Sequence, residues 1–291
     1  MKDYYNEFIL YLKTVKKSSE NTIKSYSRDV FAYLNYLKRC GVKEVSLTDQ
    51  EFICNYIIQI ESSNSATTVS RIVSSLKCYY KFLQSIDLCK QLDLKRFKTN
   101  VKTTKTLPIV LENDEIIRLI QQPDTSCLKG IRDKAMLELL YATGITVSEL
   151  LSLNIFDLNL TLGLLNINNR TIPIYNDALK TLSLYINQVR NVLVPNKDDK
   201  YLFCNLNGEP ITRQGVWKII KEHSQKAGID KVITPHTIRH TFAVHLLENG
   251  ANISEVKQLL GHSSSTTAQI YIELIKSKYR KSYKNYHPMS K

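Results

Sequence analysis

Arginine, histidine and tyrosine side chains near the C-terminal end of this sequence can together hold and attack a phosphodiester. The segment HTIRH, from His236 to His240, is followed by the tripeptide LGH, which ends at His262, and then by Tyr271. Arg239 would present a planar fork of donors that matches two phosphate oxygens, and histidines move protons near neutral pH. A tyrosine phenol becomes a covalent nucleophile once its proton is removed. This set of residues predicts DNA strand transfer.

The two histidines of the HTIRH segment also allow an interpretation as metal ligands. His236 and His240 stand four residues apart and would share one face of a helix. The metalloprotease pattern places a glutamate directly after the first histidine, however, and this chain has Thr237 there. No third ligand is apparent, so the sequence predicts no metal site.

The overall charge favours a polyanionic partner. The chain of 291 residues carries 40 Lys and Arg against 27 Asp and Glu, a net charge of +13. Such an excess promotes nucleic-acid binding through phosphate contacts and counterion release, although a generic basic surface would give the same totals. The six cysteines lack a CxxC pair and are interpreted as reduced core residues, and no apolar run is long enough to span a bilayer. We expect a cytoplasmic, nucleoid-associated protein with no membrane partner.

The pattern of apolar residues divides the chain into two domains and a linker. Residues 1–90 show helical periodicity throughout and predict a small four-helix domain. The candidate N-caps of its helices are Ser19, Thr48 or Asp49, and Ser65. Residues 91–107 are basic and polar, which predicts a linker. Residues 108–291 form the second domain.

The second domain is predicted to be helical with a small antiparallel sheet. Residues 156–174 alternate in polarity, and the pair Asn168-Asn169 predicts a tight turn between two strands. The helices expected around the sheet span residues 115–121, 129–143, 147–152, 178–193, 213–227 and 234–250, followed by one that begins with a capping box at Asn252 and Glu255 and ends at Gly261. The predicted fold class is mainly α with a small antiparallel β-sheet (α+β).

Residues 234–273 resemble the C-terminal signature of the tyrosine recombinases, the integrase and Xer group. Members of that family carry His-x-x-Arg-His, then Leu-Leu-Gly-His, then a nucleophilic tyrosine. The likeness continues in LLYATG at 139–144, in VSELL at 147–151 and in the tail at 283–288. The four-helix domain looks like the family's core-binding domain. The resemblance therefore covers nearly the whole chain.

The resemblance implies a fold and a reaction. Two domains would close as a C-shaped clamp on double-stranded DNA, and Tyr271 would attack a phosphate to form a 3′-phosphotyrosyl link. Arg239 and His262 would hold the nonbridging oxygens, and His236 would assist proton transfer. The covalent link stores the bond energy, so no cofactor is implied. The C-terminal helix would dock onto a neighbour in a homo-tetramer on paired DNA sites.

Two elements of the family pattern are missing. The family carries an arginine before Val-Ser-Glu-Leu, and Thr146 occupies that position here. The family's hairpin lysine is also absent, because the shorter segment around Asn168 and Asn169 contains no lysine. Loss of one preorganised donor costs roughly 10²–10³ in rate, and loss of a general acid costs about 10²–10⁴. The catalytic set is therefore incomplete, and we expect attenuated activity.

Neighbouring cations are candidates to replace the missing arginine and the missing lysine. Arg170 can occupy the place of the hairpin lysine, but its high pKa makes it a poor proton donor. Arg132 or Lys134 can partly replace the lost phosphate contact. None of these substitutes restores the family pattern in the sequence itself.

Two functional hypotheses follow from the retained and missing residues. In the first, the chain is a working site-specific recombinase with an atypical site. In the second, it is a catalytically inactive DNA-binding, architectural or regulatory protein on the recombinase fold, which can pair with an active recombinase in a hetero-assembly. A helical protein-interaction module without a DNA role would leave both the charge and the motif unexplained.

Basic residues outside the motif are candidate DNA contacts, although each can equally be part of a solvated face. Phosphate contacts would position the protein without reading sequence. The candidates are Lys24 and Arg28 on the second helix, Arg71, Lys77 and Lys81 on the fourth, and Lys95, Arg96 and Lys98 in the linker.

Overall fold

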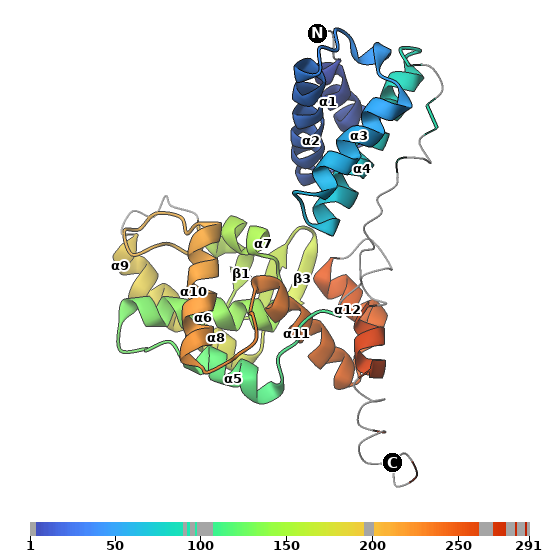
Figure 1. The fold of residues 1–291 in the computed structure, drawn as a ribbon. Coiled ribbons are helices and arrows are strands. Elements are labelled where there is room, and N and C mark those ends of the chain that lie inside the picture. Colours follow the sequence, from blue (N-terminus) through green and yellow to red (C-terminus); the bar gives the residue numbers. More distant parts are fainter. Residues whose placement is uncertain are drawn as a thin grey trace. The chain divides into compact units, whose positions relative to one another are not determined.

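The computed structural model describes residues 4–89, 92–93, 97, 107–194, 201–261, 270–277, 283 and 289. The chain divides into two compact units, residues 1–105 and 106–291 (Figure 1). Each unit has its own apolar core. The division falls within the predicted linker, residues 91–107, most of which lies outside the described residues.

The first unit is a bundle of four long helices whose first turns are capped by side chains. Ser19, Asp49 and Ser65 each accept a hydrogen bond from the backbone N–H three residues further on. Each cap satisfies a donor that has no partner within its helix, and three of the predicted N-caps are confirmed. The helices are α1 (Tyr5–Thr14), α2 (Glu20–Arg39), α3 (Gln50–Glu61) and α4 (Ala66–Ser85).

Tyrosines fill much of the core of the first unit. The hydroxyls of Tyr33 and Tyr80 lie 2.7 Å apart, and the Tyr80 hydroxyl lies 2.8 Å from Oγ1 of Thr48. Thr48 in turn donates to the carbonyl of Val45. A buried hydroxyl without a partner would cost free energy. The bundle therefore buries large aromatic rings and still pairs their polar ends.

The second unit is mainly helical around one small sheet. Its helices are α5 (Asn113–Gln121), α6 (Leu128–Thr143), α7 (Val147–Ser152), α8 (Asn176–Leu184), α9 (Asn191–Leu193), α10 (Arg213–Lys226), α11 (Pro235–Glu248), α12 (Ile253–Leu260) and a further helix at residues 270–277. A π-helix, Tyr185–Arg190, interrupts the single helix predicted over residues 178–193. Its wider turn buries both Val189 and Arg190, which a regular helical period does not anticipate.

The sheet has three short antiparallel strands in the order β1-β2-β3. They are β1 (Leu158–Asn159), β2 (Leu164–Ile167) and β3 (Arg170–Pro173). Asn168 and Asn169 have φ angles of 48° and 60°, the left-handed pair that a two-residue type I′ turn requires. The predicted turn and the α+β fold class are confirmed, and the turn places Arg170 opposite Ile167 at the end of the hairpin.

The C-terminal helices pack against this hairpin. α12 contacts both β3 and α11, and α11 contacts α6 (Figure 1). Thr234 caps α11 with Pro235 as its first residue, and Asn252 and Glu255 form the predicted capping box of α12. Gly261 then ends α12 with a φ of 67°. Segments far apart in sequence thus meet at the C-terminal end of α12.

The hairpin turn offers a test of this arrangement. An Asn169→Ala variant should lose about 1 kcal/mol of unfolding free energy, because alanine is strained in the left-handed region. Asn169→Gly is the matched control and should be at least as stable as the parent, since glycine adopts this conformation readily. Urea-induced unfolding followed by circular dichroism measures both. Equal loss in the two variants would mean that the asparagine side chain, not the backbone conformation, stabilises the turn.

Candidate active site

Tyr271, the predicted nucleophile, lies in the helix at residues 270–277 and is 1% exposed. It belongs to an apolar cluster that also contains Phe242, Val256 and Leu260. Its hydroxyl lies 3.0 Å from Nδ1 of His240. Burial raises the pKa of Tyr271, and the nearby charge of Arg239 partly offsets that rise. The phenol is therefore protonated at neutral pH and needs a proton acceptor before it can attack.

The two histidines of the HTIRH segment form a row that leads to this phenol. His236 and His240 lie on successive turns of α11 with ring centroids 6.3 Å apart, and the rings of His240 and Tyr271 are 5.6 Å apart. His236 is exposed, whereas His240 is half-buried. The row therefore runs from solvent to the buried nucleophile, which is an arrangement that can move a proton.

Arg239 is buried and ties three helices together. Its Nη1 donates to the carbonyl of Gly144 at 2.6 Å, and its Nη2 donates to the carbonyl of Leu260 at 2.7 Å. Glu149 lies 3.8 Å away. Burial lowers the pKa of Arg239, and the charge of Glu149 opposes that shift. The ends of α6 and α12 thus hold the guanidinium in place from two sides.

Glu149 on α7 accepts hydrogen bonds from several groups of the site. Its Oε2 accepts hydrogen bonds from the backbone N–H of Thr146 at 2.7 Å and from the Thr146 hydroxyl at 2.9 Å. Its Oε1 accepts from Nδ2 of Asn168 at 3.2 Å and from Nη2 of Arg170. Thr146 is therefore the N-cap of α7, and it helps to orient the carboxylate that also faces Arg239.

Arg170 enters the site from the first position of β3. Its Nη1 donates to the carbonyl of Leu259 at 2.6 Å, while Nη2 pairs with Glu149. Only 12% of its side chain is exposed. Arg170 and Arg239 thus share one carboxylate and bind successive carbonyls of α12.

Arg132 and Lys134, the other predicted substitutes for the missing phosphate contact, interact with other groups. Arg132 is buried and donates through Nε and Nη2 to Oδ1 of Asp133, whose Oδ2 lies 3.1 Å from Nε2 of His223. The charge of Lys134 acts on Glu138. The prediction that Arg132 replaces the lost phosphate contact is therefore wrong, because that guanidinium neutralises a buried carboxylate of the core.

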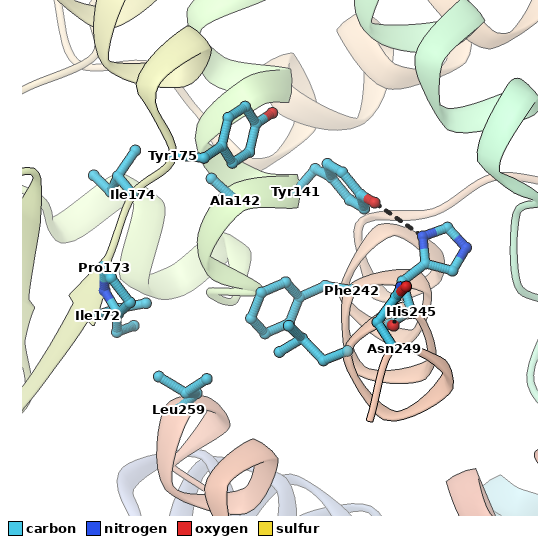
Figure 2. A pocket seen from close by; sticks show the side chains of 11 residues that line it. Tyr141, Ala142, Ile172, Pro173, Ile174, Tyr175, Phe242, His245, Asn249 and Leu259 are labelled. Carbon is cyan, nitrogen blue, oxygen red and sulfur yellow. Dashed lines mark hydrogen bonds between the residues drawn. The ribbon is translucent and has the colours of Figure 1, made fainter. Parts of the chain in front are cut away.

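An apolar cavity of about 410 Å³ lies between α6, β3, α11 and α12 (Figure 2). Its lining includes Ile172, Phe242 and Leu259. Tyr141 and His245 meet at its edge through a 2.9 Å hydrogen bond between Oη and Nδ1. Among the described residues that line this cavity there is no Lys or Arg, so they offer a phosphate no cationic partner.

The candidate DNA contacts of the first unit differ in their surroundings. Lys24, Arg28 and Lys81 are exposed and Lys77 is half-buried. Arg71 pairs with the buried Asp29, which gives it a structural role beside any contact with DNA. Four further predicted site residues, namely His262, Lys95, Arg96 and Lys98, lie outside the described residues.

The six cysteines are free thiols, and their burial differs from the prediction. Only Cys204 is buried, whereas Cys40 and Cys127 are exposed. Within the described stretches of the chain, no three His, Cys, Asp or Glu side chains gather as metal ligands. Among the helices of that same part, none combines the length and apolar character needed to cross a bilayer.

Comparison with known proteins assigns the family. The Phage integrase family matches residues 110–278, and its N-terminal SAM-like domain matches residues 5–85. The chain belongs to the phage integrase family, the tyrosine recombinases. Tyrosine recombinase XerD of Staphylococcus haemolyticus (strain JCSC1435) is 36% identical over 99% of both chains, and that of Staphylococcus aureus (strain Mu50 / ATCC 700699) is 35% identical over the same shares. It is thus a Xer-like tyrosine recombinase, as the sequence motif indicated.

Solved structures of tyrosine recombinases share this fold. The XerA recombinase is 29% identical, with a TM-score of 0.55 over 98% of both chains. The XerH site-specific recombinase in a post-cleavage complex with palindromic difH is 19% identical, with a TM-score of 0.72 over 96% of this chain and 84% of that one. The latter likeness concerns the fold alone.

Two residues of the site receive no separate role from the sequence. His240 is predicted only as a member of the HTIRH motif or as a metal ligand, and Glu149 only as part of a family motif. Arg170 is predicted as a substitute for a lysine, and the structure adds its pairing with Glu149. For His240, the available signal in the sequence was its spacing of four residues from His236. Nothing in the sequence places Arg170 beside Glu149, because they are 21 positions apart.

A Glu149→Gln variant should test the role of the shared carboxylate. Removing this charge leaves two guanidinium groups unneutralised, and we expect a loss of about 3 kcal/mol of unfolding free energy. Added sulfate should restore more stability to the variant than to the parent, because the anion replaces the missing charge. Glu20→Gln, in an exposed pair with Lys24, is the control and should lose about 1 kcal/mol or less. Thermal unfolding with increasing sulfate measures these effects, and an equal response of variant and parent would contradict the expectation.

Proposed function

We propose that this chain cuts and rejoins double-stranded DNA at specific sites through Tyr271. The observation that carries the proposal is the 3.0 Å contact between the Tyr271 hydroxyl and His240 beside the buried Arg239. A nucleophile, a proton acceptor and a phosphate-binding fork are thereby adjacent. This is the set that attack on a phosphodiester requires.

The reaction can be written with the residues of this site. His240 accepts the phenolic proton as the Tyr271 oxygen bonds to phosphorus, and the bond from phosphorus to the 5′-oxygen breaks as that oxygen takes up a proton from water. Arg239 binds a nonbridging oxygen, and His262 is proposed to bind the other. The product is a 3′-phosphotyrosyl link and a free 5′-hydroxyl. Attack by a 5′-hydroxyl of a second strand reverses the steps, with His236 assisting proton transfer, and no cofactor is consumed.

The proposal includes an assembly and a separate role for each of the two units. Residues 1–90 would bind DNA through Lys24, Arg28 and Lys81, and residues 108–291 would carry out catalysis, with both units clamped on one duplex. The working form would be a homo-tetramer on paired DNA sites, located in the cytoplasm on the nucleoid. A lambda integrase with the same fold forms a tetramer on a Holliday junction, which supports that assembly.

The second candidate function is DNA binding without cleavage. It is favoured by Thr146, which lacks charge and caps α7, where the family carries an arginine. The short hairpin, with Asn168 and Asn169 at its turn, also lacks the family's lysine. Such a protein would bind or bridge DNA, or join an active recombinase in a hetero-assembly.

Covalent trapping distinguishes the two functions. The protein's binding site would first be selected from random duplexes and then used as a nicked suicide substrate. We expect a protein–DNA adduct that survives denaturation and is absent in Tyr271→Phe, because the phenyl ring cannot form the phosphotyrosyl bond. Specific binding without an adduct would contradict the cleavage function and support the second candidate. Failure to bind any DNA would contradict both.

The pH dependence of adduct formation should identify the base. A histidine accepts a proton only when it is neutral, so the rate should rise from acidic toward neutral pH. His240→Asn should lose about 10²–10⁴ in rate and flatten that rise. His236→Asn is the matched comparison on the same helix face. If His240→Asn keeps the rise and His236→Asn removes it, His236 is the base instead.

A further inference from the structure

The charges around Glu149 do not balance. Arg170 and Arg239 bring two positive charges to one carboxylate, and all three side chains are at most 14% exposed. Isolated charge is costly in such surroundings unless a counterion is near. Counted over these three described side chains, the group carries one excess positive charge, which one bound anion would neutralise.

The Arg170 guanidinium lies flat against the end of α12. A Cβ built on Gly261 would lie 2.8 Å from Cζ and 2.9 Å from Nε of Arg170. Leu259 and Leu260, the two residues before this glycine, give their carbonyls to Arg170 and Arg239 respectively. The negative end of a helix favours cations at this position. The backbone of α12 thus holds both guanidinium groups next to one another.

Arg170 has donors left for a further ligand. Its contacts with the described residues use Nη1 and Nη2, and a guanidinium carries five N–H donors in a fixed plane. Burial lowers the pKa of Arg239 and the charge of Arg170 adds to that shift, so the two guanidinium groups are close enough to repel each other. The Arg239 charge also acts on Tyr271, so Arg239 links Arg170 to the proposed nucleophile.

We propose that Arg170 is the second phosphate-binding guanidinium of this site and supplies from β3 the charge that position 146 lacks. The inference rests on the proposed function of Tyr271 as the nucleophile. A phosphodiester carries one negative charge, which matches the excess charge of the group. Arg170 can then donate to a nonbridging oxygen in addition to the contacts proposed for Arg239 and His262. Arg170 stabilises charge in this scheme and does not donate a proton, for which its pKa is too high.

Position 146 provides an internal test of the proposal. The Thr146 hydroxyl and the Arg170 guanidinium contact the two oxygens of the same carboxylate. A guanidinium introduced by Thr146→Arg therefore reaches the same place from α7. If the two positions supply one function, the substitutions will not act independently.

The first experiment is a double-mutant cycle on adduct formation. Arg170→Gln should form the Tyr271 adduct about 10²–10³ slower than the parent. Arg170→Gln with Thr146→Arg should regain most of that rate, so Thr146→Arg should raise the rate far more in the Arg170→Gln background than in the parent. Arg118→Gln, on the exposed face of α5, is the matched control and should behave like the parent. Absence of rescue in the double variant would overturn the proposal.

A substrate without the phosphate charge distinguishes two roles of Arg170, namely binding the phosphate and positioning Glu149. On DNA with a methylphosphonate at the cleaved position, Arg170→Gln should lose far less rate than on native DNA, because little charge needs stabilising. An equal loss on both substrates would mean that Arg170 only positions Glu149, and would overturn the proposal.

Anion binding tests Arg170 even if the parent protein forms no adduct. Inorganic phosphate should raise the unfolding temperature of the parent and of Tyr271→Phe by the same amount. The rise should be smaller in Arg170→Gln and restored in its double variant with Thr146→Arg. An undiminished rise in Arg170→Gln would overturn the proposal whether or not the protein cleaves DNA.

Discussion

The shared carboxylate of Glu149 is the constraint on which the rest of the site depends. Burying a charge costs several kcal/mol unless partners surround it, and here the partners come from β3 and α11 while α12 supplies carbonyls to both. These elements can meet only if the hairpin and the C-terminal helices pack together. One largely enclosed acid on α7 therefore couples the position of the hairpin to that of the neighbours of Tyr271.

The two departures from the family pattern meet at this same acid. Thr146 caps α7 and donates to one carboxylate oxygen, while the shortened hairpin brings Asn168 and Arg170 to the other. In the sequence these look like two separate losses, each with its own cost in rate. In the structure the two positions are neighbours. Thr146, which stands where an arginine is expected, and Arg170, which the hairpin supplies, contact the same carboxylate.

The local elements were predictable because their signals are local. The caps at Ser19, Asp49 and Ser65 and the Asn168-Asn169 turn depend on residues within a few positions of each other. The sequence did not predict the π-helix at Tyr185–Arg190, whose last residue donates from Nε to the carbonyl of Tyr201, a contact outside the helix. The proposed role of Arg132 failed for the same kind of reason, since its partner Asp133 is fixed by burial in the core.

The sequence by itself determined the family and predicted Tyr271 as the nucleophile, because a motif of fixed order and spacing carries that information, and its apolar periodicity predicted two domains. It also determined an excess of positive charge suited to a polyanion. Only the tertiary structure decided which charges lie together. The contact of His240 with Tyr271 and the pairing of Arg170 with Glu149 join residues 31 and 21 positions apart. Such contacts depend on how helices and strands pack, and side-chain spacing along the chain does not encode them.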